Sequence, residues 1–304
     1  KRYSIDRNKY ISHSIHFSET NSFQNLRGRI TLDYHNIEKG LTHIEDMRKG
    51  FGQSAMNDLF KALDEYVEKG YPVDDIRYVT AINVLKKYIE RHKEHNFSMP
   101  DLEHKINAYP LGNIVDSGVY VINHNKFEHN SFRELLENRH SIREFGSEVI
   151  DYNKLQESIL LATRAPSACN RQPCKVYLVS DIDLIKELLH LQGGLNGNGS
   201  NIQYLILITS NKSLYRWDHE RNQNFIDGGI FSGTLLYSLE ANNIASCPLH
   251  CDLSINVEND IKSLLSISEP EDLIHFIAVG SFPEQSVVPV SLRDRYSDFV
   301  IENF

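Results

Sequence analysis

Two short stretches of the sequence carry residue types suited to a flat, anionic ligand. Residues 139–143 read RHSIR and place two guanidiniums and a hydroxyl within five residues. Residues 166–173 read PSACNRQP and combine prolines with small and amide side chains. Arginine forms forked, charge-assisted hydrogen bonds with a phosphate or a ring carbonyl. Ser, Asn and Gln offer neutral donors and acceptors to the edge of a heterocycle.

Each of these arginines has an ordinary interpretation when it is taken alone. A solvated arginine at a helix end is common, and surface ion pairs contribute little to stability. The combination of two arginines, a hydroxyl and a nearby amide-rich turn favours a ligand site over that interpretation.

The order of these residues resembles a known family. R-H-S-x-R, followed after about two dozen residues by A-P-S-A-x-N-x-Q-P, is similar to the nitroreductase-like FMN-dependent oxidoreductases. The resemblance runs from about residue 131 to the C-terminus. It implies an α+β fold over 131–304, a mainly antiparallel sheet flanked by helices. Residues 1–130 are then an all-α N-terminal extension and a connector.

The resemblance also implies where a cofactor binds. FMN would be held without a covalent link, in two sites at a homodimer interface. The expected contacts to its phosphate, ribityl chain and pyrimidine from one subunit are Arg139, Ser141 and Arg143. Those expected from the other subunit are Pro166, Ser167, Ala168 and Asn170. The further expected contacts are His140, Gln172, Asn196, Pro248, Leu249, His250, Cys251, Arg293 and Arg295.

Arg293 and Arg295 match a basic-x-Arg pair that holds the FMN phosphate in similar proteins. By themselves, these two arginines fit a charged tail equally well. The loop at 193–200, GGLNGNGS, lacks both the G-x-G-x-x-G phasing and the P-loop lysine. We therefore expect a flexible loop from which Asn196 or Asn198 reaches the ligand.

The corner at 248–251 passes the reactive edge of the flavin in similar proteins. The family often has Glu-Gly where this chain has His250 and Cys251. His250 is the predicted catalytic residue, as a proton donor. The alternative is that no such donor is needed, because the flavin itself carries out hydride transfer.

The implied activity is an FMN-dependent reaction with NADH or NADPH as the reductant. Hydride would pass to FMN and then to a small nitro, quinone or ene acceptor in a ping-pong cycle. Two alternatives stay open. One is non-reductase flavin chemistry, such as oxidase, dehalogenase or flavin-cleaving activity. The other is a partner-binding module with a vestigial flavin site.

Alternating helices and strands position these residues. A helix is predicted to begin at the N-cap Asp151 and to end at Pro166. Strands are predicted at 175–180, 202–209, 244–249 and 275–282, with helices at 183–191, 217–242 and 257–265. The 217–242 helix contains three glycines, which favour close helix packing, as at a dimer core.

Apolar stripes at helical spacing predict three or four helices within residues 20–108. His35 and Glu38 lie three residues apart, and the pair is interpreted as a surface or packing contact rather than an acid–base or metal pair. His92 and His95 lie in a charged helix end and are predicted to be solvated. This helical region is expected to restrict the site or to bind a protein partner.

Composition limits the remaining classes. A net charge of −9 argues against general nucleic-acid binding, and no apolar run reaches the length of a membrane span. Residues 1–17 lack the apolar core of a signal peptide. The four cysteines are interpreted as reduced thiols in the cytoplasm, and a metal site at Cys247 and Cys251 is disfavoured because no second ligand pair has suitable spacing.

Overall fold

The computed structural model describes residues 2–15, 22–41, 47–110, 130–195, 201–286, 296 and 300–301. Within them, five helices precede residue 110. They are α1 (Arg2–His13), α2 (Phe23–Leu41), α3 (Gln53–Glu68), α4 (Ile76–Glu94) and α5 (Pro100–Asn107). The predicted all-α N-terminal region is confirmed over these ranges.

Helices and strands alternate from residue 130, as predicted. The helices are α6 (Asn130–Asn138), α7 (Tyr152–Ala162), α8 (Ile182–Gln192), α9 (Gln223–Ala241) and α10 (Ile255–Leu264). The short 3-10 turns are η2 (Ala168–Asn170), η3 (Lys212–Leu214) and η4 (Asp218–Glu220). The strands are β1 (Cys174–Val179), β2 (Tyr204–Asn211), β3 (Ala245–Leu249) and β4 (Glu271–Gly280).

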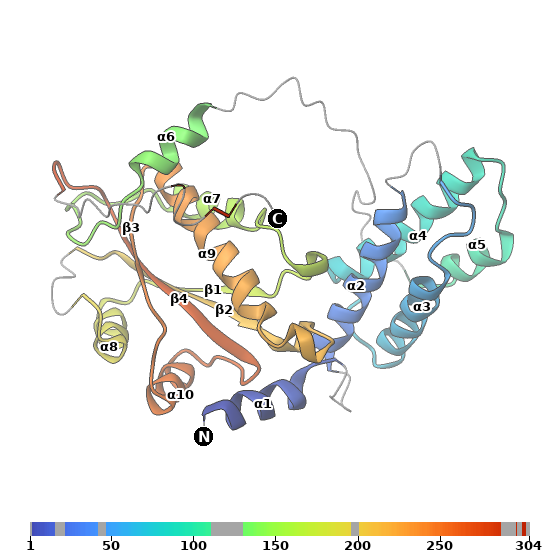
Figure 1. Cartoon of the computed structure of the whole chain (residues 1–304), viewed down its shortest axis with the longest axis horizontal. Coiled ribbons are helices and arrows are strands. Elements are labelled where there is room, and N and C mark those ends of the chain that lie inside the picture. The colour runs from blue at the N-terminus through green and yellow to red at the C-terminus, as the bar shows by residue number, and fades with distance from the viewer. Residues whose placement is uncertain are drawn as a thin grey trace.

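The four strands form one antiparallel sheet in the order β1-β2-β4-β3. Successive side chains of β2 alternate between its two faces, as the pleat of a strand requires. Leu205 and Leu207 pack with α8 and α10, whereas Ile206 and Ile208 pack with α7 and α9. The sheet therefore lies between two helical layers, with α2–α5 to one side of it (Figure 1). The predicted α+β class is confirmed.

Helix ends follow local chemistry. Asp151 caps α7 as predicted, because its carboxylate accepts a hydrogen bond from the Asn153 N–H at 2.8 Å. The predicted end at Pro166 is wrong, since α7 ends at Ala162. Proline disfavours the α conformation of the residue before it, and residues 163–165 form a tighter turn with i to i−3 hydrogen bonds. The long helix predicted within 217–242 is confirmed as α9, which begins at Gln223 after η4.

The prediction that His92 is solvated is wrong. Its side chain is fully buried in the helical core and accepts a hydrogen bond from the Gly50 N–H at 3.0 Å through Nε2. Its Nδ1 donates to the Tyr88 carbonyl at 2.8 Å. Burial lowers the pKa of His92. The charged neighbours lie on the outer face of α4, whereas His92 continues the inner stripe one turn after Tyr88. His95 is half-buried, so the prediction that it is solvated is only partly right.

The helical region packs closely on the α/β part. The Asn25 amide of α2 donates to the Ser213 carbonyl at 2.8 Å. Gly28 approaches η3 so closely that a Cβ there would lie 2.9 Å from the Leu214 Cα. At α1, Lys9 forms an ion pair with Glu258 at 3.2 Å. The proposed domain boundary near residue 130 stays a prediction. None of the helices in the described ranges is long and apolar enough to span a membrane.

Candidate functional site

The arginine-rich half of the motif lies along the edge strand β3. The Ile142 N–H donates to the Ser246 carbonyl at 2.9 Å, and the Gly146 N–H donates to the Ser281 carbonyl at 2.9 Å. The segment is thereby fixed next to the start of β3. Burial raises the pKa of the Cys247 thiol. The positive charge of nearby Arg143 acts in the opposite direction and lowers that pKa.

The hydrogen-bond donors on the side chains of this half have only some of their partners among the described residues. The Arg139 Nη1 atom is buried and has no hydrogen-bond partner among the described residues. Arg143 makes one long contact, from Nη1 to the Ser141 carbonyl at 3.4 Å. His140 Nδ1 donates to the Asn138 carbonyl at 2.7 Å. A buried guanidinium atom without an acceptor is the feature expected of an anion site.

The corner after β3 lies on the same side of the molecule as this segment. Pro248 and Leu249 are the last residues of β3, and His250 and Cys251 follow them. The Gln192 amide at the end of α8 donates to the His250 carbonyl at 3.0 Å. Burial raises the pKa of Cys251 to about 12, so this thiol is neutral at physiological pH. Of the other predicted contacts, Asn196, Arg293 and Arg295 lie outside the described residues.

His250 itself is exposed, and its protonation pattern follows from one contact. Its Nδ1 accepts a hydrogen bond from the Asp252 N–H at 3.2 Å. A neutral imidazole that accepts at Nδ1 carries its proton on Nε2. A neutral ring in this position can therefore donate a hydrogen bond from Nε2, and the predicted role as a proton donor stays a prediction.

The amide-rich half of the motif lies at the other end of the sheet. This segment leads into Cys174, the first residue of β1. In the sheet, Cys174 lies opposite Ser210 of β2, and Ser210 lies opposite Asp272 of β4. Ser246, beside the arginine-rich half, pairs with Val279 of β4. Seven residues of strand separate Asp272 from Val279, which corresponds to about 23 Å along the strand direction alone. A single chain therefore does not bring the two halves of the motif together.

The backbone of the amide-rich half is strained. Cys169, Asn170 and Gln172 have φ values of 53°, 52° and 47°, in the left-handed region that non-glycine residues rarely adopt. Such strain persists only where the surroundings impose it, and it is concentrated at functional sites. The Ser167 hydroxyl helps to fix the turn by accepting from the Gln172 N–H at 3.0 Å.

Arg171 contacts this turn from its buried side, although the sequence pattern gave it no role. Its side chain is fully buried. The guanidinium donates to the Ala168 carbonyl at 2.9 Å and the Leu214 carbonyl at 3.3 Å, and it forms an ion pair with Glu220. It also lies over the Tyr215 ring, 4.7 Å from the centroid. The carboxylate of Glu220 is held in turn by the N–H groups of residues 216 and 217, at 2.8 and 3.1 Å.

Asp227 of α9 fixes the start of the same turn. Its carboxylate accepts from the Ala168 N–H at 3.1 Å, the Tyr215 hydroxyl at 2.8 Å and the Gln223 amide at 2.8 Å. Burial, followed by the negative charge of Asp227, raises the pKa of Tyr215. Asp227 lies in the glycine-bearing helix predicted within 217–242, and the sequence pattern alone gave it no role. Its proximity to the PSACNRQP run comes from the packing of α9 on the sheet.

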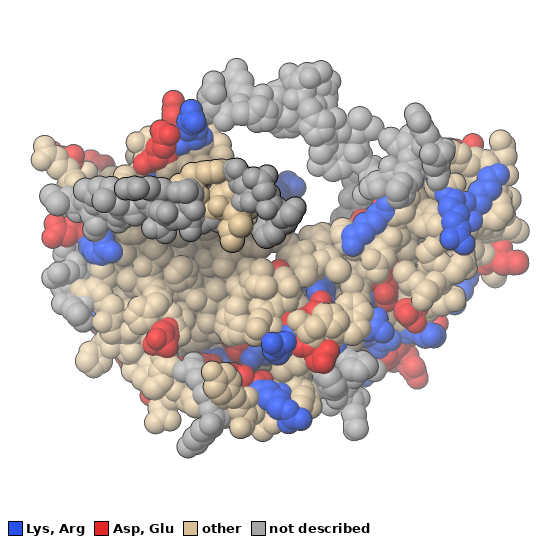
Figure 2. Space-filling model, viewed as in Figure 1, with Lys and Arg blue, Asp and Glu red and all other residues tan. Residues whose placement is uncertain are grey.

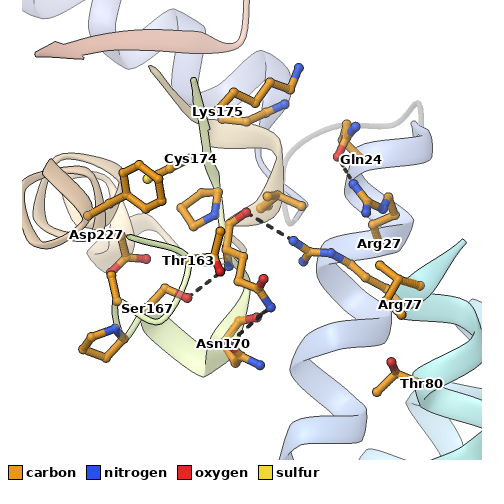
Figure 3. Close-up of a pocket in the computed structure, with 18 of the residues that line it drawn as sticks. Gln24, Arg27, Arg77, Thr80, Thr163, Ser167, Asn170, Cys174, Lys175 and Asp227 are labelled. Atoms are coloured by element: carbon orange, nitrogen blue, oxygen red, sulfur yellow. Dashed lines mark hydrogen bonds between the residues drawn. The ribbon is translucent and has the colours of Figure 1, made fainter. Parts of the chain in front are cut away.

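A cavity of about 400 Å³ separates this turn from the helical region. Its wall includes Ser167, Asn170 and Gln172 on one side and Arg27, Tyr34 and Arg77 on the other. Figure 3 shows Arg77 of α4 directed toward the turn that carries Ser167 and Asn170, whereas Arg27 of α2 contacts Gln24. The helical region thus contributes directly to a cavity that contains predicted site residues. Over the described part of the chain, no group of three or more His, Cys, Asp or Glu side chains is placed to hold a metal ion.

A family model matches the segment that contains both motifs. Residues 136–196 match the model of the Nitroreductase family. A 50-residue segment is 44% identical to a Streptococcus pyogenes protein provisionally named an NAD(P)H nitroreductase. That match covers 16% of this chain and only 25% of the relative.

Solved structures confirm the nitroreductase fold. A provisionally named NADH dehydrogenase/NAD(P)H nitroreductase from Parabacteroides distasonis aligns with a TM-score of 0.51 and 18% identity, over 58% of this chain and 99% of its own. A Desulfovibrio desulfuricans protein, provisionally named a nitroreductase and solved in complex with FMN, aligns with a TM-score of 0.50 and 18% identity, over 58% of this chain and 98% of its own. These structures are matched almost completely, so the rest of this chain is additional to their fold.

Proposed function

We propose that this protein is an FMN-dependent NAD(P)H oxidoreductase that reduces a small organic acceptor of the nitro, quinone or ene type. The observation that carries the proposal is the buried Arg139 Nη1 atom, which has no hydrogen-bond partner among the described residues and lies within the family's arginine motif. When bound, FMN supplies the redox chemistry, taking hydride from reduced nicotinamide and passing it to the acceptor.

The residues of this chain fit that cofactor. Arg139 and Arg143 supply guanidinium donors for the anionic and carbonyl groups of FMN, and Ser141 supplies a hydroxyl. His250 is proposed to donate a hydrogen bond from Nε2 to the acceptor. The FMN complex of the Desulfovibrio desulfuricans protein supports the choice of cofactor through the shared fold.

A homodimer with shared sites accounts for the separation of the two motif halves. α9 exposes three large apolar side chains, Phe225, Ile226 and Ile230, at 49%, 53% and 40% of their surface. The surface over this helix carries few charged side chains (Figure 2). A Cβ at Gly229 or Gly233 would meet no atom of the described chain, which leaves room for a close neighbour. Pairing two copies through α9 would supply the amide-rich half to the partner's arginine-rich half.

The absorption spectrum of the purified protein tests this function. We expect a yellow protein that releases FMN, and not FAD, on denaturation. Anaerobic NADH or NADPH should bleach the flavin absorbance within the time of a turnover, and an added nitroarene or quinone should restore it. Bound FMN that neither nicotinamide reduces would favour oxidase, dehalogenase or flavin-cleaving chemistry instead. A protein that cannot be reconstituted with FMN would favour a partner-binding module.

A further inference from the structure

Arg77 of α4 is a buried cation that forms no ion pair with a carboxylate of the described residues. Its side chain is 7% exposed. Nη1 donates to the Thr31 hydroxyl at 3.0 Å and Nη2 to the Gln172 carbonyl at 3.2 Å, both neutral acceptors. No carboxylate of the described residues lies within ion-pair distance of it. Burial, followed by the charge of Arg27, lowers the pKa of Arg77 to about 10, so it remains charged at neutral pH.

An uncompensated buried charge is costly, and buried charges in proteins are normally paired. The other charged groups around this cavity already have partners. Arg27 is paired with Asp75 at 3.1 Å, and Lys175 with Glu271 at 2.6 Å. On the acidic side, Glu38 contacts His35 at 3.2 Å, and Asp227 accepts the three hydrogen bonds described above. Arg77 is therefore the cation of the described cavity wall that has no ion pair, and the wall also carries the carboxylates of Glu38 and Asp227.

We propose that the cavity between α2, α4 and the 166–173 turn binds a small organic anion, a carboxylate or a phosphate monoester, with Arg77 as its counterion. The volume of about 400 Å³ suits a ligand of that size. Guanidinium is the side chain best matched to either anion because it forms two parallel hydrogen bonds. The identification of this anion as the electron acceptor rests on the proposed function, whereas its binding does not.

Thr80 offers a way to test the charge of the cavity without removing Arg77. It follows Arg77 by three residues on α4, so the two side chains share one face of the helix. Thr80 is half-buried and lines the cavity (Figure 3). Thr80→Glu places a carboxylate in the cavity as an internal counterion, and Thr80→Gln is a neutral control of matched size. Arg77→Met removes the cation, and Arg29→Met is its control because Arg29 is paired with Glu65 at 3.0 Å and does not line the cavity.

The experiment is calorimetric titration of the full-length, FMN-loaded, oxidised protein with three probes of similar shape. These are 4-nitrobenzoate, 4-nitrophenyl phosphate and the neutral 4-nitrobenzamide. We expect one anion to bind about 10- to 100-fold more tightly than the amide, the range expected of charge-assisted hydrogen bonds. The preferred probe then distinguishes a carboxylate ligand from a phosphate ligand. Thr80→Glu and Arg77→Met should abolish the preference, and Thr80→Gln and Arg29→Met should retain it.

Three results would overturn the inference. They are equal binding of the amide and both anions by the wild type, equal behaviour of Thr80→Glu and Thr80→Gln, and loss of FMN from Thr80→Glu alone. The last result would mean that the cavity belongs to the cofactor. NADH-dependent bleaching, measured in parallel, separates the two proposals. Anion preference without bleaching refutes only the function, whereas bleaching without anion preference refutes only the anion site.

Discussion

Arg171 is the side chain on which the geometry of the PSACNRQP turn most depends, and its replacement gives a quantitative test. Arg171→Met removes the ion pair with Glu220, two hydrogen bonds to carbonyl oxygens and the contact with the Tyr215 ring. It keeps most of the apolar stem volume. Breaking a buried ion pair by removing one partner costs about 3–5 kcal/mol, because the other charge is left unpaired. We expect a loss of that size in the free energy of unfolding.

Urea denaturation at pH 7, followed by circular dichroism, would measure this loss. Glu220→Gln is the matched variant of the partner, since both backbone N–H groups donate to one carboxylate oxygen and the amide oxygen can still accept them. The double variant should lose less than the sum of the single losses, by about 1–3 kcal/mol, because the two residues are directly coupled. FMN affinity should fall in Arg171→Met, since the strained turn is no longer held. A loss below about 1 kcal/mol, or strict additivity, would refute the assignment of this ion pair as the support of the turn.

Three further predictions test other contacts. Burial, followed by the charge of Asp58, raises the pKa of Asp33 from 3.8 to about 7. The favourable contribution of protonated Asp33 to the free energy of unfolding is therefore fully present below pH 4 and is lost as the pH rises through 7. The stability of Asp33→Asn relative to wild type should therefore increase by a few kcal/mol from pH 4 to pH 8, and a flat difference in urea denaturation would contradict this. Gly28→Ala should destabilise by about 1–3 kcal/mol, despite the better helix propensity of Ala, because the Leu214 backbone cannot move away. Unchanged or increased stability in thermal denaturation would exclude the close approach. Co-expressed Arg139→Ala and Asn170→Ala chains, each inactive alone, should regain about one quarter of wild-type activity, because random pairing makes half of the dimers mixed and one of their two sites intact. Activity no higher than that of the single variants, with dimers intact by gel filtration, would mean that both residues serve a site from one chain.

Element types were predictable from the sequence because each rests on a local pattern. The alternation of Leu205, Ile206, Leu207 and Ile208 between two cores follows from strand geometry, and the Asp151 cap from its position before an apolar stripe. His92 was assigned wrongly because the charges on either side of it hid its place on the inner stripe of α4. The local pattern does not reveal which polar residue is used inside a core.

The candidate site was predictable only in part, because its supports come from distant residues. The family motif gave the segments 139–143 and 166–173, but Arg171 acquires its role through Glu220, 49 positions along the chain. Arg77 contacts Gln172 across 95 positions, and only the packing of the helical region creates that contact. Neither spacing follows from a local period.

The helical region and the cofactor motif meet at one turn but use different atoms of it. Arg77 donates to the Gln172 carbonyl, while Arg171 donates to the Ala168 carbonyl and Asp227 accepts from the Ala168 N–H. The arginine-rich half of the motif lies at the other end of the sheet and makes none of these contacts. Changes on α4 are therefore expected to alter ligand choice in the cavity while leaving FMN affinity intact, and changes at Arg139 to do the reverse. An added helical region can in this way give a minimal flavin fold a new specificity without altering its cofactor contacts.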